Sequence, residues 1–309
     1  MSKLLRLGLL AVLVSCASCE KTGTSNKPGD GAGGAGGGAT TAGDIALRYK
    51  AGSAKLKQTG KFDMNTSGGG QFGEAVLEYT ATLELAGQGE NIKVNWSFAD
   101  VSKLEVKGMF EDKSGGDDPK AFLVAEGKGA FLVDALGKLD DKGTEALAEN
   151  AARRDRFKKL EADAKASGKE PKTSAGENIL AMADGMVALP DLPSQGLSVG
   201  KSVTVEDEDE AQIGGIVLPS ETETKYTLVK IDESGGQRIA ELQIEAVTSG
   251  AAEMGQGMLS VDMTTEGTML FDIDAGIPVS YKLTRSQSFA FGPNTFETMT
   301  ILEAAFELI

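Results

Sequence analysis

Apolar and polar residues alternate over most of the chain beyond Gly43. In 75–85 the odd positions are Ala, Leu or Tyr, whereas Glu and Thr occupy most of the even positions. In 92–98, Ile, Val, Trp and Phe alternate with Lys, Asn and Ser. A period of two residues is typical of a β-strand that buries one face and exposes the other. Both segments therefore predict half-buried strands.

Glycine-rich turns separate the predicted strands. They occur at 67–70, 87–89, 114–116, 234–236 and 274–276. Short turns of this kind join neighbouring strands into hairpins. We therefore expect a mainly β (α+β) body over 44–309, in which long hairpins form a curved antiparallel sheet, a sandwich or a half-barrel.

Two parts of this body resemble each other. A Tyr-Thr pair, a leucine, a glycine turn and an alternating strand occur over 78–96 and again over 225–244. A Glu-Gly pair before an apolar segment occurs over 126–134 and again over 266–272. A duplicated β unit is one interpretation, and the ordinary likeness of one hairpin to another is the alternative.

The period changes between the two β parts. Pairs of opposite charge four residues apart indicate a helix over 144–166. An apolar stripe indicates a second helix over 177–188, and Pro190 follows its end. This two-helix insertion at about 144–188 can either cover one face of the sheet or close over a cavity. In the second case an apolar ligand would contact Ile179, Met182, Met186 and Val187.

The first residues have the composition of a secretory signal. Lys3 and Arg6 give a positive start, an apolar run follows over 7–14, and small residues come after it. The run has eight residues. A membrane-spanning helix needs about 20 apolar residues. The pattern therefore predicts a signal peptide over 1–15.

The signal ends on Leu13-Val14-Ser15-Cys16, which resembles the lipobox of bacterial lipoproteins. In that family the cysteine thiol receives a diacylglyceryl group, and cleavage before the cysteine makes it the new N-terminus. The resemblance implies that acyl chains on Cys16 anchor the protein in a membrane. Two alternatives stay open, namely lipidation of Cys19 and cleavage after Ala17 by an ordinary signal peptidase, which would give a secreted protein.

A glycine-rich segment separates this N-terminus from the body. Gly, Ala, Thr and Ser dominate 22–43, and none of them can fill an apolar core. Such a composition predicts a flexible coil with a root-mean-square reach of about 25 Å. We therefore expect 16–43 to consist of the lipidated cysteine and a tether that holds the body clear of the headgroups.

Charge and composition narrow the chemistry of the body. The chain has no histidine, two cysteines and a net charge of −15, which becomes −17 once Lys3 and Arg6 are removed. The lack of histidine removes the commonest metal ligand and the usual activator of a catalytic nucleophile. An acidic body repels nucleic acid and anionic headgroups, so the acyl chains would provide the membrane contact. We expect no cofactor, no metal site and no nucleic-acid partner.

Three short motifs resemble ligand-binding sequences but lack the required context. The sequence GKS at 200–202 ends like a phosphate-binding loop, yet a strand-like sequence follows where such a loop needs a helix. The acidic run 206–210 would direct alternate carboxylates to opposite sides of a strand, which favours a solvated loop or protection of a sheet edge over a calcium site. The segment 272–276 begins like a calcium loop, but Leu283 occupies the position of the closing glutamate, so we expect a hairpin turn.

A second resemblance covers most of the body. The segments 189–193, with the sequence LPDLP, and 197–204, with the sequence LSVGKSVT, resemble an LP…P…VG…S signature in β-rich bacterial lipoproteins of unknown function. Val203 stands where that family commonly has tryptophan, and the opening 45–52 is similar to the start of those domains. The resemblance implies a β-rich fold and a cell-envelope location, and it implies no activity.

Together these features predict a lipid-anchored protein of the bacterial cell envelope, at the outer membrane facing the periplasm or the cell surface. Its expected role is non-catalytic, either binding or structural, because the sequence offers no catalytic motif. One alternative is a periplasmic carrier of lipid or another apolar ligand. Another is a carboxylate-dependent hydrolase, although the 46 acidic residues show no distinctive spacing.

Overall fold

The computed structural model describes residues 44–50, 52–108, 110–111, 118–151, 155, 162, 166, 180, 182–183, 185–213, 216–254, 257–291 and 294–309. The predicted signal peptide over 1–15, Cys16, Cys19, the tether over 16–43 and Ile179 lie outside these ranges.

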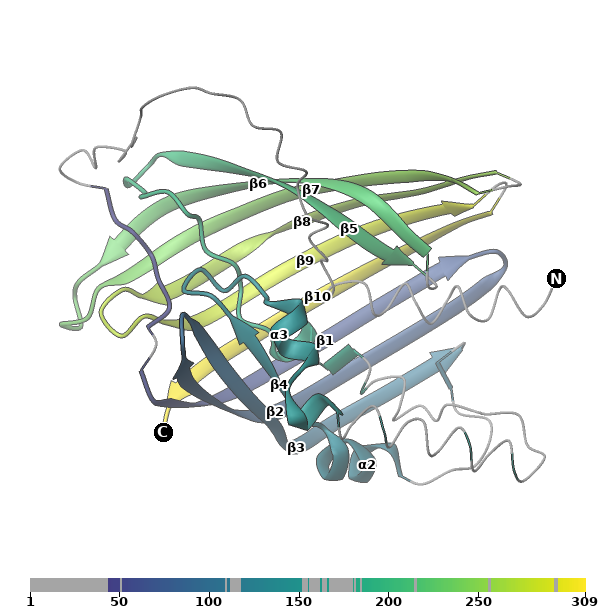
Figure 1. The fold of residues 1–309 in the computed structure, drawn as a ribbon, viewed down its shortest axis with the longest axis horizontal. Coiled ribbons are helices and arrows are strands. Elements are labelled where there is room, and N and C mark those ends of the chain that lie inside the picture. The colour runs from purple at the N-terminus through teal and green to yellow at the C-terminus, as the bar shows by residue number, and fades with distance from the viewer. Residues whose placement is uncertain are drawn as a thin grey trace.

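Ten strands form one open antiparallel sheet (Figure 1). Their order across the sheet is β4-β3-β2-β1-β10-β9-β8-β7-β6-β5. Their bounds are β1 Ala54–Gly68, β2 Gln71–Gln88, β3 Asn91–Gly108, β4 Lys128–Val133, β5 Ser202–Ile213, β6 Ile216–Asp232, β7 Ile239–Met254, β8 Gly257–Asp272, β9 Ile277–Phe291 and β10 Asn294–Leu308. The prediction of a mainly β body built from long antiparallel hairpins is confirmed. Because the strands form a single sheet, the sandwich form is not adopted.

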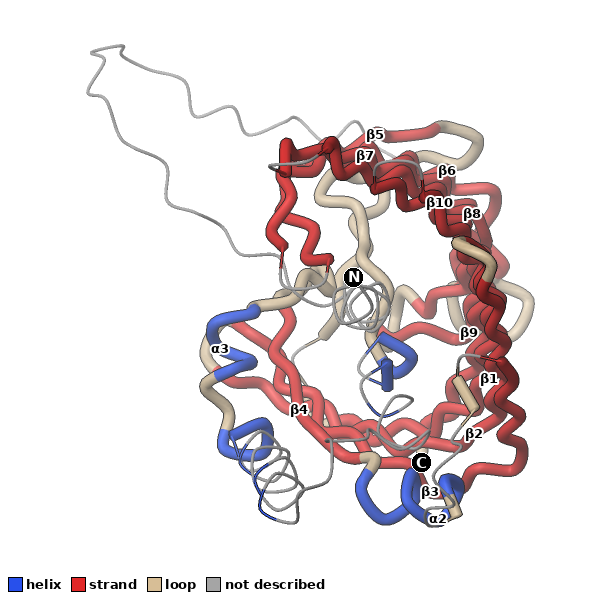
Figure 2. Tube along the Cα trace, turned by 90° about the vertical axis from the view of Figure 1, so that its right-hand side faces the viewer, coloured by secondary structure: helices blue, strands red, loops and turns tan. Residues whose placement is uncertain are grey.

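The strands follow an arc when they are viewed along their length (Figure 2). The two ends of the arc do not pair with each other, because β4 and β5 are the edges of the sheet. A loop after β4 nevertheless reaches β5, where Lys138 Nζ lies 2.7 Å from Asp207 Oδ1. The sheet is therefore open in its hydrogen bonding, although its two edges are linked through side chains.

The alternation of each strand determines which face is buried. We call the buried side the covered face; it carries large apolar residues that include Leu56, Tyr79, Leu83, Leu242, Met269 and Phe271. Residues 44–50 and the described residues of 180–197 pack on it. Ile45 and Leu197 exchange main-chain hydrogen bonds of 2.8 and 2.9 Å, and the Tyr49 ring packs edge-on against Phe271 with centroids 5.5 Å apart. The core thus lies between one sheet and the chain's own connecting segments.

The opposite side, which we call the open face, carries the polar members of the alternation. They include Thr59, Lys61, Glu78, Thr80, Lys282 and Glu303, which are exposed or half-buried. This division between an apolar and a polar face agrees with the period of two seen in the sequence.

Two short helices lie beside β3 and β4 (Figure 2), α2 Pro119–Glu126 and α3 Asp141–Glu145. The sequence pattern did not predict α2, which begins with Asp118 as its N-cap and proline in its first turn. Of the predicted helices, the described residues 148–151, 155, 162 and 166 are helical, and so are 180, 182–183 and 185–187. A break at 146–147 separates α3 from the first of them.

The two edges of the sheet are protected in different ways. On β4, the Leu132 amide donates to Thr144 Oγ1 at 2.8 Å, and Asn150 Nδ2 donates to the Ala130 carbonyl at 2.7 Å. These side chains take the place of a neighbouring strand. On β5, the edge carries the acidic run 206–210, so this run belongs to an edge strand and the alternative of a solvated loop is wrong.

The two similar parts of the sequence correspond only partly in the fold. The segments 78–96 and 225–244 form the hairpins β2–β3 and β6–β7, and each hairpin contains an irregularity of register. The segment 126–134, however, ends α2 and forms the edge strand β4, whereas 266–272 belongs to the central strand β8. Duplication stays an interpretation of the hairpins.

Candidate functional site

A polar cluster lies within the covered face. Gln58 of β1 is fully buried, although its neighbours on this face are apolar. Its Nε2 donates to the Met186 carbonyl at 3.1 Å and to the Tyr79 hydroxyl at 3.2 Å. The hydroxyls of Tyr79 and Tyr281 donate to the same carbonyl at 2.7 and 3.4 Å. Three strands therefore direct donors at one main-chain oxygen.

This oxygen needs donors because of its place in the chain. Met186 belongs to the last helical turn before the irregular segment 188–193, so the helix supplies no donor to its carbonyl. A buried carbonyl without a partner costs about 1–3 kcal/mol. Gln58 Oε1, by contrast, has no hydrogen-bond partner within the described part of the chain. The cluster thus fixes the end of the 180–187 segment to the sheet at the expense of one buried acceptor.

The tyrosines of the covered face are held in their neutral form. Burial raises the pKa of Tyr79 and of Tyr281. Burial also raises the pKa of Tyr49 and of Tyr226, and the negative charge of Asp191 adds to both shifts. The Tyr49 hydroxyl donates to the Pro190 carbonyl at 2.7 Å. The segment 180–197 is therefore held at two consecutive points by hydroxyls that keep their protons.

The residues predicted to contact an apolar ligand lie inside the core. Met182, Met186 and Val187 are 6, 1 and 0 % exposed, and all three belong to the same apolar cluster as Leu56, Tyr79 and Leu242. The three residues therefore lie together over the sheet, which agrees with an insertion that covers one face of the sheet. Their neighbours are residues of this chain, and contact with a ligand stays a prediction, as it does for Ile179.

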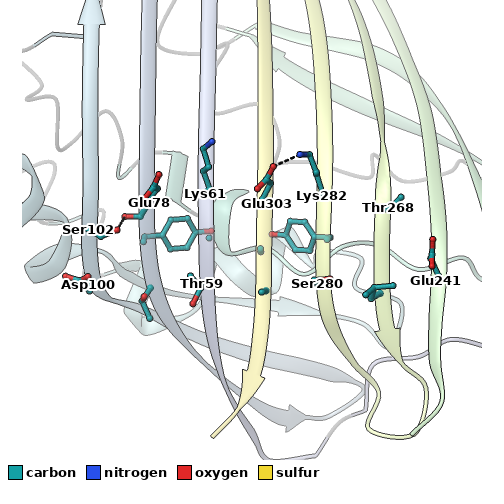
Figure 3. Close-up of a pocket in the computed structure, with 17 residues that line it drawn as sticks. Thr59, Lys61, Glu78, Asp100, Ser102, Glu241, Thr268, Ser280, Lys282 and Glu303 are labelled. Atoms are coloured by element: carbon teal, nitrogen blue, oxygen red, sulfur yellow. Dashed lines mark hydrogen bonds and ion pairs between the residues drawn. The ribbon is translucent and has the colours of Figure 1, made fainter. Parts of the chain in front are cut away.

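A shallow trough of about 740 Å³ crosses the open face (Figure 3). It extends over seven strands, from β3 to β7. Hydroxyls and charged groups line it, among them Thr59, Lys61, Glu78, Asp100, Ser102, Glu241, Thr268, Ser280, Lys282 and Glu303. No single stretch of the sequence contains this surface, because its members come from strands far apart in the chain.

Charges of alternating sign form a row across this trough. The strand register aligns Lys103, Glu78, Lys61, Glu303 and Lys282 on five adjacent strands. Figure 3 shows the last four of them at one level of the sheet. Lys282 Nζ lies 2.6 Å from Glu303 Oε1, and this hydrogen bond lowers the pKa of the Glu303 carboxyl. In this row each charged side chain lies opposite a charge of the other sign on the neighbouring strand, which favours the pairing of the strands.

This arrangement is poorly suited to acid–base catalysis. A general acid near neutral pH needs a raised carboxyl pKa, and the shift of Glu303 has the opposite direction. Lys61 lies between Glu78 and Glu303 in the row, so each of these two acids faces a basic side chain on the neighbouring strand. The trough therefore resembles a polar surface more than the site of a carboxylate hydrolase.

The remaining motifs adopt the local structures expected of them. After the GKS sequence, strand β5 begins at Ser202, so no helix follows the lysine. The 273–276 segment is a turn between β8 and β9, in which the amides of Asp274 and Ala275 donate to Asp272 Oδ1 at 2.9 and 2.8 Å. Among the described residues, no group of three or more His, Cys, Asp or Glu is placed to hold a metal ion. No helix in the same residues is long and apolar enough to cross a membrane.

The chain matches no protein-family model, and no curated protein is significantly similar to it in sequence. Function must therefore be argued from the residues. One signal of the polar cluster was present in the sequence: in 54–64, Gln58 and Gly60 interrupt an otherwise apolar series at the even positions. A polar residue at a buried position indicates a specific hydrogen-bond partner.

Proposed function

We propose that this chain is a lipid-anchored protein of the bacterial cell envelope with a non-catalytic binding or structural role. The observation that carries the proposal is the sequence Leu13-Val14-Ser15-Cys16 directly after the short apolar run 7–14. Two or more acyl chains anchor a protein stably, at about 0.8 kcal/mol for each buried methylene. The body would face the periplasm or the cell surface, with the outer membrane as its location.

Two features of the body support a role without catalysis. The chain's own residues from 44–50 and 180–197 fill the covered face, so the apolar core stabilises the fold. On the open face, the described acids of the charge row have basic neighbours, and Glu303 is held in its charged form. The position of the folded body after a glycine-rich segment is consistent with a tethered domain.

The anchor is tested by two single substitutions. Cys16→Ser removes the thiol that would carry the diacylglyceryl group, so palmitate labelling should be lost and the protein should leave the membrane fraction or keep its signal. Cys19→Ser is the matched control, and it should change neither result. Membrane retention of the unsubstituted protein should persist in high salt, because acyl chains hold through apolar transfer. Loss of labelling in Cys19→Ser but not in Cys16→Ser would show that Cys19 carries the lipid. An unlabelled wild-type protein would refute the lipid anchor.

A carrier of lipid is the second candidate, and one observation favours it. The segment 180–187 lies over a large apolar face, and part of what fixes it there is a polar cluster in which Gln58 Oε1 has no hydrogen-bond partner among the described residues. Displacement of this segment would open the apolar cluster that it shares with Leu56, Leu83 and Leu242 to an acyl chain. Native purification followed by mass spectrometry tests this candidate. A stoichiometric lipid that is absent from a denatured and refolded sample would support it, and a lipid-free native protein would contradict it.

A further inference from the structure

The polar cluster of the covered face contains three side chains that the sheet itself holds together. Gln58, Tyr79 and Tyr281 come from β1, β2 and β9, and we call them the donor trio. All three donate to one main-chain oxygen, and Gln58 also donates to the Tyr79 hydroxyl. Gly60 makes this arrangement possible, because a Cβ at this position would collide with the Tyr79 ring. The sheet therefore fixes three hydrogen-bonding groups around one point.

The oxygen at this point belongs to a segment that is separate from the sheet. The segment 185–193 contains no strand. Among its contacts, the Leu192 amide donates to the Leu136 carbonyl at 2.7 Å, and the Pro190 carbonyl accepts from the Tyr49 hydroxyl. The strands, by contrast, pair only with one another in the order across the sheet. Displacement of the segment would therefore leave the pairing of the strands intact.

The carboxamide of Gln58 is only partly used by this oxygen. Its Nε2 donates to the Met186 carbonyl, whereas its Oε1 has no hydrogen-bond partner among the described residues. Gln58 is fully buried, so a missing partner for Oε1 is unfavourable. A main-chain carbonyl can accept a hydrogen bond but cannot donate one. The Met186 carbonyl thus satisfies the donor of the Gln58 carboxamide and leaves its acceptor unused.

An undissociated carboxylic acid complements both halves of a carboxamide. Its carbonyl oxygen accepts, and its hydroxyl, bonded to the same carbon, donates. Its carbonyl would take the place of the Met186 carbonyl among the donor trio, and its hydroxyl would donate to Gln58 Oε1. The trio is uncharged, because burial raises the pKa of Tyr79 and of Tyr281. Neutral donors within an apolar core favour the neutral form of a bound acid.

We propose that the donor trio binds the head group of a long-chain carboxylic acid, and that the Met186 carbonyl occupies this site in the ligand-free chain. The proposal rests on the carrier candidate above and names its class of ligand. Met186 and Val187 share one apolar cluster with Leu56, Leu83 and Leu242. An alkyl chain that replaces the first two would therefore lie against the other three. The ligand supplies the hydrogen bonds and the apolar contacts that the displaced segment gives up, which offsets the cost of displacement.

Cross-linking of a fatty acid tests both the place and the class of ligand. The full lipidated chain is reconstituted in phosphatidylcholine vesicles with a palmitic acid analogue that carries a diazirine near its carboxyl group. After illumination, mass spectrometry of the digested protein should find cross-links on covered-face residues beside Gln58, such as Leu56 and Leu83. Unlabelled palmitic acid should displace the analogue at a mole fraction about tenfold lower than methyl palmitate, because the ester lacks the hydroxyl that Oε1 accepts.

Three substitutions assign the effect to the donor trio. Gln58→Met removes both polar atoms of the carboxamide, so cross-linking here should fall about tenfold and the preference for acid over ester should disappear. Gln243→Met is the matched control at an exposed position of β7, and it should change neither result. Tyr281→Phe removes the hydroxyl that lies 3.4 Å from the Met186 carbonyl. This variant should weaken acid and ester equally, and it keeps the test valid if Gln58→Met does not fold.

The possible outcomes separate this proposal from the carrier candidate. Cross-links confined to exposed residues, or unchanged in a folded Gln58→Met variant, would overturn the site. Equal displacement by palmitic acid and methyl palmitate would overturn the class of ligand. In either case, a lipid that still accompanies the native protein during purification would leave the carrier candidate standing. A lipid-free native protein would contradict the carrier, and the head-group site with it.

Discussion

Gly60 provides a sharp test of how the polar cluster is packed. This residue of β1 faces Tyr79 of β2, and a Cβ added at Gly60 would lie 2.6 Å from Tyr79 Cε1 and closer still to Cζ and the hydroxyl. Real Cβ atoms do not approach a ring this closely, so Gly60→Ala must displace the Tyr79 side chain. The hydroxyl would then lose its 2.7 Å bond to the Met186 carbonyl.

The expected cost follows from two contributions. Overpacking of a buried site costs about 1–3 kcal/mol. Weakening of a buried hydrogen bond adds about 1 kcal/mol. We therefore expect Gly60→Ala to lower the free energy of unfolding by about 2–4 kcal/mol, although alanine is favoured over glycine by about 0.5–1 kcal/mol in an ordinary strand.

A double-mutant cycle identifies the cause. Tyr79→Ala removes the ring and should itself cost about 3–5 kcal/mol. In that background Gly60→Ala should be neutral or slightly stabilising, so the coupling between the two sites should be about 2 kcal/mol or more. Urea unfolding followed through Trp96, the single tryptophan, measures each variant. Gly235→Ala, which meets no heavy atom within 4 Å, is the control and should change little. An equal cost of Gly60→Ala in both backgrounds would refute the reasoning.

Two further predictions concern the tyrosines and the β4 edge. Because burial raises the pKa of all four tyrosines in the native state, the folded chain binds more protons than the unfolded chain above pH 10, and its stability should fall as the pH rises beyond that value. Absorbance at 295 nm should show ordinary tyrosine titration in urea and delayed titration in the native protein; coincident curves would contradict this. Asn150→Ala removes donors to the Ala130 and Thr144 carbonyls and should cost about 1–2 kcal/mol, whereas Lys282→Ala, at an exposed ion pair, should cost under about 1 kcal/mol. Equal losses in the two variants would argue against the edge contact.

The sequence predicted what depends on local periodicity. The alternation in 75–85 and 92–98 identified β2 and β3 and the face that each strand buries. It could not distinguish one sheet from a sandwich, because an apolar face looks the same whether a second sheet or a connecting segment covers it. The segment 44–50 that packs there is short and distant in sequence from 180–197, so only the folded chain reveals their pairing.

The features that the sequence does not predict are missing from it for equally physical reasons. Helix α2 has eight residues, which is too short for a clear helical period, although Asp118 followed by Pro119 is a recognisable start signal. The polar cluster depends on contacts between Gln58 and Met186, which are 128 residues apart. The trough on the open face combines seven strands, so no single segment contains its pattern.

The acidic edge strand allows a last prediction. On β5, Glu206 and Glu208 are exposed and lie directly opposite Glu223 and Glu221 of β6. Like charges in these positions destabilise the pairing, by roughly 0.2–1 kcal/mol for each pair. An exposed edge strand readily pairs with a second chain, and charged side chains on the edge oppose such pairing. The gain from preventing association would therefore offset the cost of the like charges. We infer that the acids on β5 keep the edge from pairing.

Two double substitutions separate these effects. One variant carries Glu206→Thr and Glu208→Thr on β5, and the other carries Glu221→Thr and Glu223→Thr on β6. Each variant removes two negative charges from the same face of the hairpin and relieves the same repulsion. Both should therefore raise the stability of the β5–β6 hairpin. Only the β5 variant should associate with itself, because β6 has a hydrogen-bonded neighbour on each side and β5 has one. Sedimentation velocity over a range of concentrations measures the difference. Two monomeric variants would show that the acids are not needed at the edge, and equal association of both would assign the effect to net charge, since the two variants differ only in which strand lost its acids.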